Sequence, residues 1–294
     1  MNRALHRGTY AQDPDLLRRV FALLDSAFPG LSGRVRGLAP SGLRWDRVST
    51  PFVVSERGRL VAHVGVLEVP MVLDGCETLV GGMHAVCTHP EFRGRGYFRR
   101  AMNAALAWCD ERYGTVALIG GPPELYAPFG FRVVPESRFV GPVLRSSPSP
   151  ERPRLRRVAL DQVGDRRLLD RLLDERAQVS RRLGVVRERS VFLFTQAREP
   201  MWYAEDLDAI LCLEIADGTL RLYDIVATRV PALEQVVDRI DAPLNRVEVY
   251  FTPDQLGAPL AAEPHVVDGD SWLLARGPFA SVEGGLMLPR TIRF

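Results

Sequence analysis

Residues 85–100 read AVCTHPEFRGRGYFRR, and this stretch decides the fold. A strand-like run meets a turn that contains Gly94 and Gly96 and leads directly into a helix. The first turn of a helix leaves backbone N–H groups without partners and carries partial positive charge. The two glycines let an anion approach those groups, and Arg93 and Arg95 add full charges beside them. The stretch predicts an anion-binding loop at a helix N-terminus.

Two common phosphate-binding loops are excluded. A P-loop needs a lysine after its last glycine, and this chain contains no lysine. A dinucleotide-binding loop needs a third glycine and an acidic residue about 20 positions further on at the end of a second strand, and both are missing. The loop therefore belongs to another kind of anion site.

The pattern Arg-x-x-Gly-x-(Gly/Ala), here RGRGYF at residues 93–98, resembles the acetyl-CoA pyrophosphate loop of GCN5-related N-acetyltransferases, the GNAT superfamily. Phe98 departs from the usual glycine or alanine. The enhanced intracellular survival (Eis) type branch shares that departure, and the chain looks like this branch. That branch usually carries a third, sterol-carrier-like domain, which we expect this protein to lack.

A second stretch supports the resemblance. Residues 115–119 (TVALI) are typical of a buried strand, and after GGPP at 120–123 come residues 124–132, ELYAPFGFR. This run is similar to the second GNAT signature, a short helix that carries a tyrosine and ends in Gly-Phe. Two signatures in the right order are more specific than either alone.

Composition and charge narrow the class of protein. At 294 residues the chain is long enough for two domains, and a net charge of +2 without a basic stripe argues against a nucleic-acid partner. The cysteines Cys76, Cys87, Cys109 and Cys212 are scattered, so neither a zinc site nor a disulfide framework is indicated. No stretch is typical of a signal peptide or a membrane span. We expect a cytoplasmic protein without a metal or a membrane partner, and homo-oligomerisation is left open.

The fold expected is α/β, in mixed layers, with tandem GNAT-like domains of which the second is degenerate. Residues 145–153, RSSPSPERP, favour an extended linker between a catalytic domain at 1–144 and a second domain at 154–294. In the first domain we expect a strand near 4–10, a helix near 15–28, and strands near 52–56, 59–67, 69–73, 77–86 and 115–119. Closing strands follow near 132–134 and 139–144, with hairpin turns at 57–58 and 74–75.

The second half repeats this outline more weakly. It predicts helices near 166–183 and 231–240, hairpin strands near 209–215 and 219–226 that turn at 217–218, and a strand near 246–252. The position equivalent to the anion loop, residues 227–231, reads ATRVP and has no glycine. A second cofactor site is therefore not expected.

The resemblance implies transfer of an acetyl group from acetyl-CoA to a primary amine by direct attack in a ternary complex. It implies that the strand ending at Val86, Cys87 and Thr88 binds the pantetheine arm through its backbone. The residues implied for the pyrophosphate are Arg93, Gly94, Arg95, Gly96, Tyr97, Phe98 and Arg99. A glycine-rich turn used only for packing is the alternative.

Three residues are candidates for the chemistry. Tyr126 occupies the position of the family's catalytic tyrosine, and a phenol is protonated at neutral pH and can donate to a thiolate; a core tyrosine is the alternative. His84 has a suitable ordinary pKa for the base, although a single strand histidine is more often structural. The resemblance also implies a terminal carboxylate in the active site, which points to Phe294; the alternative is a tail that packs between the domains.

The acceptor is the least determined part. A cavity lined by Phe28, Leu31 and Trp45 and by the C-terminal tail would suit a small-molecule amine with an apolar or sugar body. Acetylation of a protein amine, or binding of acetyl-CoA by a regulatory module without catalysis, are the alternatives.

Overall fold

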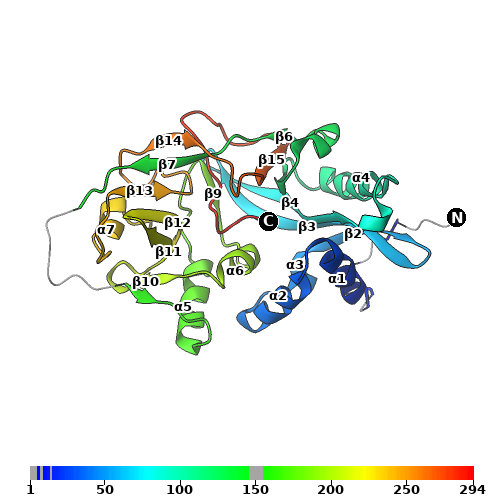
Figure 1. Ribbon diagram of the computed structural model, residues 1–294, viewed down its shortest axis with the longest axis horizontal. Helices are drawn as coiled ribbons and strands as arrows, with labels where there is room; N and C mark the ends of the chain where they lie inside the picture. The colour runs from blue at the N-terminus through cyan, green and yellow to red at the C-terminus, as the bar shows by residue number, and fades with distance from the viewer. Residues whose placement is uncertain (1–4, 7–8, 14, 146–154) are drawn as a thin grey trace.

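The computed structural model describes residues 5–6, 9–13, 15–145 and 155–294, and Figure 1 shows two mixed sheets side by side with helices packed around them. The expected mixed α/β layers are confirmed. Most of the predicted linker, residues 146–153, lies outside the described residues. No described helix is long and apolar enough to cross a membrane.

The first sheet has the strand order β1-β2-β3-β4-β5-β15-β6, and β9 pairs with β3. Its strands are β1 (Leu5–His6), β2 (Thr50–Glu56), β3 (Arg59–Leu73), β4 (Cys76–Thr88), β5 (Val116–Gly120), β6 (Arg132–Val133), β9 (Leu183–Val185) and β15 (Trp272–Arg276). Neighbouring strands are antiparallel except β4 and β5, which are parallel. The residues expected to form two strands at 59–67 and 69–73 form the single long strand β3.

Two helical groups cover this sheet. On one face lies α4 (Tyr97–Asp110), whose buried residues include Ala101, Met102 and Cys109. The other group is α1 (Leu16–Ala27), α2 (Leu31–Leu38), η1 (Ala39–Ser41) and α3 (Trp45–Val48), and it forms a separate apolar cluster against β2 and β3. The short helices η2 (Pro90–Phe92), η3 (Pro123–Leu125) and η4 (Ala127–Phe129) lie in the connections.

The hairpin turns form where the sequence predicts them. Residue pairs Arg57-Gly58, Asp74-Gly75 and Asp217-Gly218 all have positive φ at both positions, between 45° and 85°. A two-residue turn of this type matches the twist of the flanking strands, and glycine at its second position adopts the left-handed conformation at low cost. These turns fix the register of the long hairpins.

The second sheet has the order β14-β7-β13-β12-β11-β10-β8. Its strands are β7 (Ser137–Gly141), β8 (Arg156–Arg157), β10 (Trp202–Ala204), β11 (Ala209–Ala216), β12 (Thr219–Ala227), β13 (Arg246–Val249) and β14 (Ala261–Pro264). The helices around it are α5 (Val163–Asp174), α6 (Ser190–Gln196), η5 (Glu205–Leu207) and α7 (Leu233–Val237). The helix predicted near 166–183 thus ends at Asp174, because the chain turns there and buries Arg176 against Asp224.

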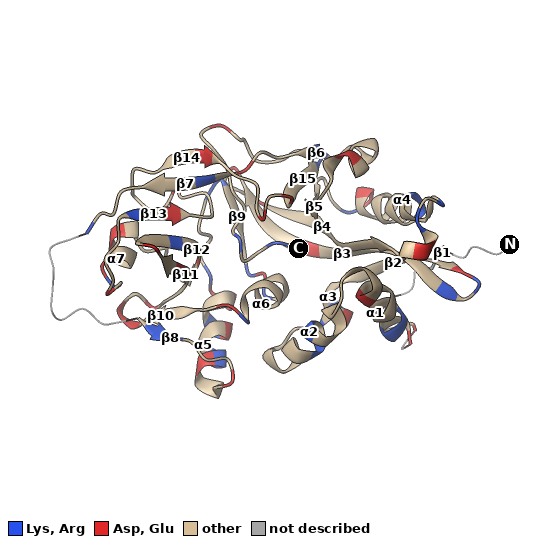
Figure 2. Ribbon diagram, viewed as in Figure 1, with Lys and Arg blue, Asp and Glu red and all other residues tan. Residues whose placement is uncertain are grey.

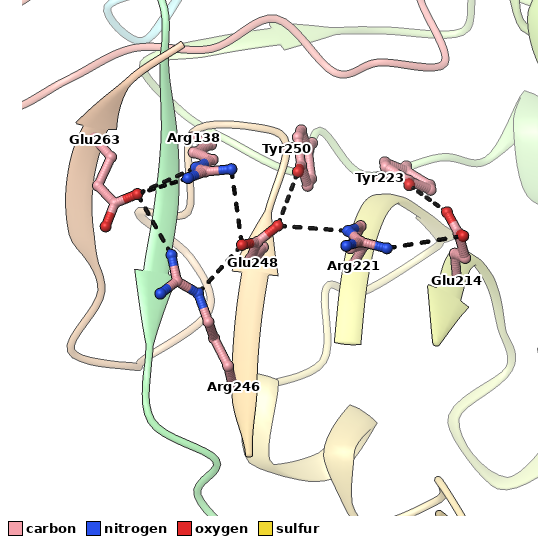
Figure 3. A network of polar contacts seen from close by, with 8 residues as sticks. All are labelled: Arg138, Glu214, Arg221, Tyr223, Arg246, Glu248, Tyr250 and Glu263. Atoms are coloured by element: carbon pink, nitrogen blue, oxygen red, sulfur yellow. Dashed lines mark hydrogen bonds and ion pairs between the residues drawn. The ribbon is translucent and has the colours of Figure 1, made fainter. Parts of the chain in front are cut away.

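The sheets exchange strands across the middle of the chain. The prediction that residues 139–144 close the first sheet is wrong, because β7 lies between β13 and β14 of the second. Figure 3 shows how side chains fix it there: Arg138 of β7 contacts Glu263 of β14 at 3.0 Å and Glu248 of β13 at 3.8 Å. In return β15, from the second half of the sequence, pairs with β5 and β6. Each half of the chain contributes to both sheets.

The last residues of the sequence run between the sheets and are anchored from both sides. The buried Thr291 donates a hydrogen bond to Asp224, which is itself paired with Arg176. Arg293 contacts Glu136 at 2.7 Å, and Leu288 N–H donates to the same carboxylate at 3.0 Å. These contacts hold residues 286–294 in one place beside the first sheet.

Candidate active site

The anion loop has the geometry that the sequence predicts. Gly94 and Gly96 adopt φ of +74° and +77°, and α4 begins directly after them at Tyr97. A Cβ atom added at either glycine would have no neighbour within 4 Å, so the loop is open above its backbone. An anion can therefore approach the first turn of α4, where helix N–H groups lack intrahelical partners.

Arg93 and Arg95 of the loop are exposed, whereas Tyr97 is buried, and Figure 2 colours the basic residues of this region blue. The Arg93 side chain donates to the Thr88 carbonyl at 3.4 Å, and Arg95 lies 3.9 Å from Glu56. Tyr97 is 1% exposed, and its hydroxyl donates to Glu56. The Tyr97 side chain therefore anchors the loop, and only its backbone is placed for a ligand. Arg99 is exposed.

The strands β4 and β5 separate beside this loop. Their parallel pairing runs from Gly81 and Val116 to Met83 and Leu118, whereas β4 continues to Thr88 and β5 to Gly120. The register of β4 against β3 shifts in the same region, where Ala85 has the left-handed φ of +49°. A bulge of this kind bends a strand and redirects its side chains. The result is a gap bordered by the backbone of residues 84–88.

A cavity of about 350 Å³ lies at this gap and brings the candidate residues together. Tyr126, His84, Val86 and Phe294 all line it. The predicted wall of Phe28, Leu31 and Trp45 with the C-terminal tail is confirmed. Some of these candidates are far apart in the sequence, and the fold brings them to one cavity.

Tyr126 packs directly against the loop helix. Its ring meets the edge of Phe98 at a centroid distance of 5.9 Å, and Phe98 in turn meets Phe129 at 5.5 Å. Tyr126 is 8% exposed, and burial raises the pKa of its phenol above the ordinary 10.0. The hydroxyl therefore stays protonated at neutral pH. The unusual Phe98 thus connects the two signatures of the sequence.

His84 also lines the cavity, where it contacts Ser49 and Trp45. Its Nε2 is 2.9 Å from the Ser49 hydroxyl, and its ring meets Trp45 at a centroid distance of 4.9 Å. Enclosure by these neighbours lowers the pKa of His84 to about 3, although part of the ring faces the cavity. A neutral imidazole with so low a pKa is a weak proton acceptor. Its role as the base stays a prediction.

Phe294 also reaches the cavity. A Cβ atom added at Gly82 would lie 3.1 Å from its ring, so the ring packs closely on β4. The neighbouring Arg293 lines the cavity as well. The part expected of the Phe294 carboxylate stays a prediction.

The strand residues expected to bind the pantetheine arm, Val86, Cys87 and Thr88, differ in where their side chains lie. Val86 lines the cavity, whereas the Cys87 side chain is buried and points away to the cluster around α1. Burial raises the pKa of the Cys87 thiol to about 12, so it is unsuited to act as a nucleophile. Thr88 is half-buried and accepts the Arg93 contact through its carbonyl. Within the described ranges no three His, Cys, Asp or Glu residues are grouped to hold a metal ion.

Sequence reasoning missed the wall supplied by the second half of the chain. Ser190, Val191 and Phe194 of α6 line the cavity together with the first-half residues. Their only signal is a short apolar run, SVFLF at 190–194, which is equally typical of a core helix. Nothing in the local sequence shows which sheet this helix covers.

Comparison with known proteins agrees with the fold. The family described as an acetyltransferase (GNAT) domain matches residues 12–134. No curated protein matches the sequence. The matched residues include the anion loop, β4, β5 and Tyr126, so the family match contains the part of the cavity wall that comes from the first half of the chain.

Several solved structures share the fold over nearly the whole chain. A conserved protein of unknown function from Enterococcus faecalis, described as a probable N-acyltransferase, matches with a TM-score of 0.62 and 14% identity over 94% of this chain and 72% of the other. A GCN5-related N-acetyltransferase from Kribbella flavida gives 0.58 and 19% over 93% and 70%. Eis1 from Mycobacterium abscessus gives 0.57 and 14% over 92% and 73%. Residues 12–134 are therefore similar to a GNAT acetyltransferase domain, and the fold of the chain resembles these structures over more than nine-tenths of its length.

Proposed function

We propose that the protein transfers an acetyl group from acetyl-CoA to a primary amine. One observation supports this most strongly: the open anion loop, the gap between β4 and β5 and the buried phenol of Tyr126 converge on one cavity. An anion loop alone would suit many ligands. A loop joined to a gap with a protonated acid beside it suits a long anionic thioester whose sulfur must be protonated on leaving.

The residues of the loop and strand hold the cosubstrate. Acetyl-CoA supplies the thioester carbon that the amine attacks. The backbone of the first turn of α4, with Gly94 and Gly96, binds the pyrophosphate, and Arg93, Arg95 and Arg99 add positive charge around it. The free backbone edge at Val86 to Thr88 orients the arm in the gap.

The transfer step needs one proton donor and one proton acceptor. The amine nitrogen forms a bond to the acetyl carbon as the carbon–sulfur bond breaks, and Tyr126 donates its proton to the leaving thiolate. The proton lost by the amine then restores the phenol through solvent. Since an apolar cavity lowers the pKa of a bound ammonium, the amine loses its proton readily there, and a weak base is sufficient.

Replacing Tyr126 with phenylalanine removes the acid and keeps the packing on Phe98. We expect kcat to fall about 100-fold, since general acid catalysis contributes about 10²–10⁴-fold, while the acetyl-CoA affinity measured by calorimetry stays the same. Thiol release in the presence of an amine panel measures kcat. An unchanged kcat would show that Tyr126 is only a packing residue, and acetyl-CoA binding without transfer to any amine would favour a sensor instead.

We further propose that the chain belongs with the Eis-type branch. The bulky pair Tyr97 and Phe98 after the second glycine supports this, as does the presence of Phe294 in the cavity wall. If the Phe294 carboxylate orients the amine, adding residues after Phe294 should lower turnover about tenfold or more and leave acetyl-CoA affinity unchanged. Equal turnover with and without the extension would remove this role.

We also propose that the second sheet is a GNAT-like unit without its own cofactor. Its parallel pair, β12 and β13, corresponds to β4 and β5. Beyond this pair the position of a cofactor is taken by the chain itself, where Met287 is buried and exchanges hydrogen bonds with Thr252. A stoichiometry of one acetyl-CoA per chain by calorimetry is the expected result, and two would contradict the proposal.

A further inference from the structure

The cavity wall carries few charges, namely the Arg293 guanidinium and the carboxylate proposed for Phe294. Apolar and aromatic side chains dominate the lining, and its polar side chains are His84, Tyr126, Ser190 and Arg293. Among the described residues that line it, none is aspartate or glutamate. A site that holds several ammonium groups needs carboxylates to replace their hydration, because an unpaired charge in an apolar site is costly.

The aromatic residues form a fixed frame around the acceptor side. Trp45 meets Phe194 at a centroid distance of 6.4 Å and Phe21 at 5.7 Å. Its indole N–H donates to the Tyr10 hydroxyl at 3.2 Å, so its polar group is already satisfied. The Arg34 guanidinium covers the Phe194 ring at 4.3 Å. The wall on this side therefore presents ring carbons to the cavity.

Carboxylates do occur nearby, but the Arg293 guanidinium lies between them and the cavity. A second hollow of about 540 Å³ shares Phe194 and Arg293 with the cavity as walls, and Glu199 and Glu214 line it. Arg293, held at 2.7 Å by Glu136, stands where the two hollows meet. A polycation that reached those carboxylates would have to pass this guanidinium, and like charges at close range disfavour that path.

We infer that the acceptor is a primary amine with a single charge on an aromatic or similarly apolar body, an arylalkylamine, rather than a polyamine or a polyamine sugar. The inference rests on the proposed acetyl transfer and names its substrate class. A volume of about 350 Å³ also lies at the low end of the ~300–1,000 Å³ typical of small-molecule sites. The exposed Phe28, at 40%, provides an apolar entrance.

The first experiment compares acceptors with the full chain and acetyl-CoA. Thiol release is measured with 2-phenylethylamine, spermidine, an aminoglycoside and a lysine-containing peptide. We expect kcat/KM for 2-phenylethylamine to exceed that for the other three at least about tenfold, since the lining has no aspartate or glutamate side chain to bind further ammonium or polar groups beyond the one amine that the Phe294 carboxylate is proposed to orient. Comparable or better use of spermidine, the aminoglycoside or the peptide would overturn the inference and leave acetyl transfer standing.

A pair of variants tests the charge argument. Ser190→Asp places a carboxylate in the wall at the start of α6, and Ser190→Asn is its neutral match. We expect S190D to raise the ratio of spermidine to 2-phenylethylamine kcat/KM about tenfold, and S190N to leave it near the wild-type ratio. Equal ratios in both variants would contradict the argument from charge.

Phe194→Ala tests the aromatic wall. It should lower kcat/KM for 2-phenylethylamine about tenfold and have little effect on acetyl-CoA affinity, because Phe194 belongs to the acceptor side. An unchanged kcat/KM would count against the aromatic frame. Failure of every amine to accept acetyl, with acetyl-CoA still bound, would overturn the proposed transfer itself.

Discussion

At the scale of single residues, Gly65 matters because the His84 ring packs directly on it. A Cβ atom at Gly65 would be 2.5 Å from His84 Nε2 and 2.9 Å from the neighbouring ring carbons. Glycine therefore allows the His84 ring to lie directly against β3 and to contact both Ser49 and Trp45. Sequence reasoning drew attention to His84 and passed over the glycine that makes room for it.

Gly65→Ala should displace His84 and, through it, Trp45. We expect a loss of roughly 1–3 kcal/mol in the free energy of unfolding, as is usual for overpacking, and a lower kcat/KM for the amine with unchanged acetyl-CoA affinity. Gly33→Ala, on the open side of α2 with no neighbour within 4 Å, is the matched control and should be neutral or stabilising. Denaturant unfolding and steady-state kinetics measure both, and equal effects would contradict the account.

Two histidines predict a pH dependence of stability, of which His63 is buried and His84 is half-buried. Burial lowers the pKa of His63 to about 4 and that of His84 to about 3, from the ordinary 6.5. Between these values and 6.5 the unfolded chain binds more protons, so stability is complete above about pH 6.5 and falls as the pH falls. At pH 5 the loss is roughly 2 kcal/mol per histidine.

The variant His63→Asn separates this effect from that of the carboxylates. Asparagine cannot titrate, and its amide N–H can replace the Nδ1 hydrogen bond to the Ala85 carbonyl, which is 2.8 Å long. The variant should lose about half of the histidine-dependent change in unfolding free energy between pH 7 and pH 5. A wild-type protein with equal stability at both values would show that these rings are accessible to water.

At the scale of elements, two helices begin in the same unusual way. Gly30 precedes α2 with φ +83°, and Gly96 precedes α4 with φ +77°. A Cβ atom at either position meets no neighbour within 4 Å. A side chain would cause the same kind of backbone strain at Gly30 and at Gly96, but only Gly96 belongs to the anion loop.

Gly96→Ala and Gly30→Ala therefore form a matched pair. Both should lose about 1–2 kcal/mol of unfolding free energy from left-handed strain. Only G96A should weaken acetyl-CoA binding, with an increase in Kd of about tenfold or more. Its methyl group would enter the open space above the loop, where the pyrophosphate is proposed to bind. Calorimetry on both variants is the measurement, and a similar Kd change in G30A would contradict the location of the site.

Elements with a local cause could be predicted from the sequence. The turns at Asp74-Gly75 and Asp217-Gly218, the helix after Gly96 and the cavity wall at Trp45 follow from residue types and spacing. The positions of β7, β9 and β15 could not, because each pairs with a strand distant in the sequence. A strand of five residues such as WLLAR, 272–276, carries no mark of its partner. For the same reason the contribution of α6 to the site was missed.

At the scale of the whole molecule, the matched acetyltransferase region is not a closed structure by itself. The strand β15 pairs along the whole of β5 and also with β6, and Thr115 donates to the Pro278 carbonyl at 2.5 Å. Without residues 272–278, β5 would expose an edge and the apolar residues Leu273 and Leu274 would be missing from the core. The family match at 12–134 therefore covers the site signatures and only part of the sheet.

A fragment of residues 1–145 tests this dependence. We expect it to aggregate or to lack a cooperative unfolding transition, because it cannot fill the place of β15. Supplying residues 155–294 as a second chain should restore cooperative unfolding, monitored by circular dichroism. A fragment that unfolds cooperatively by itself would show that the exchanged strands add stability to a sheet already formed.

The strand β15 also has a consequence for the order of events during synthesis. A ribosome synthesises a chain from its N-terminus, and domains generally fold as they emerge from the exit tunnel. Here the anion loop at 93–98 leaves the exit tunnel long before β15, which begins at Trp272. Until β15 is made, one edge of β5 stays unpaired, so this protein depends more on protection of the growing polypeptide than a sheet completed in sequence order would.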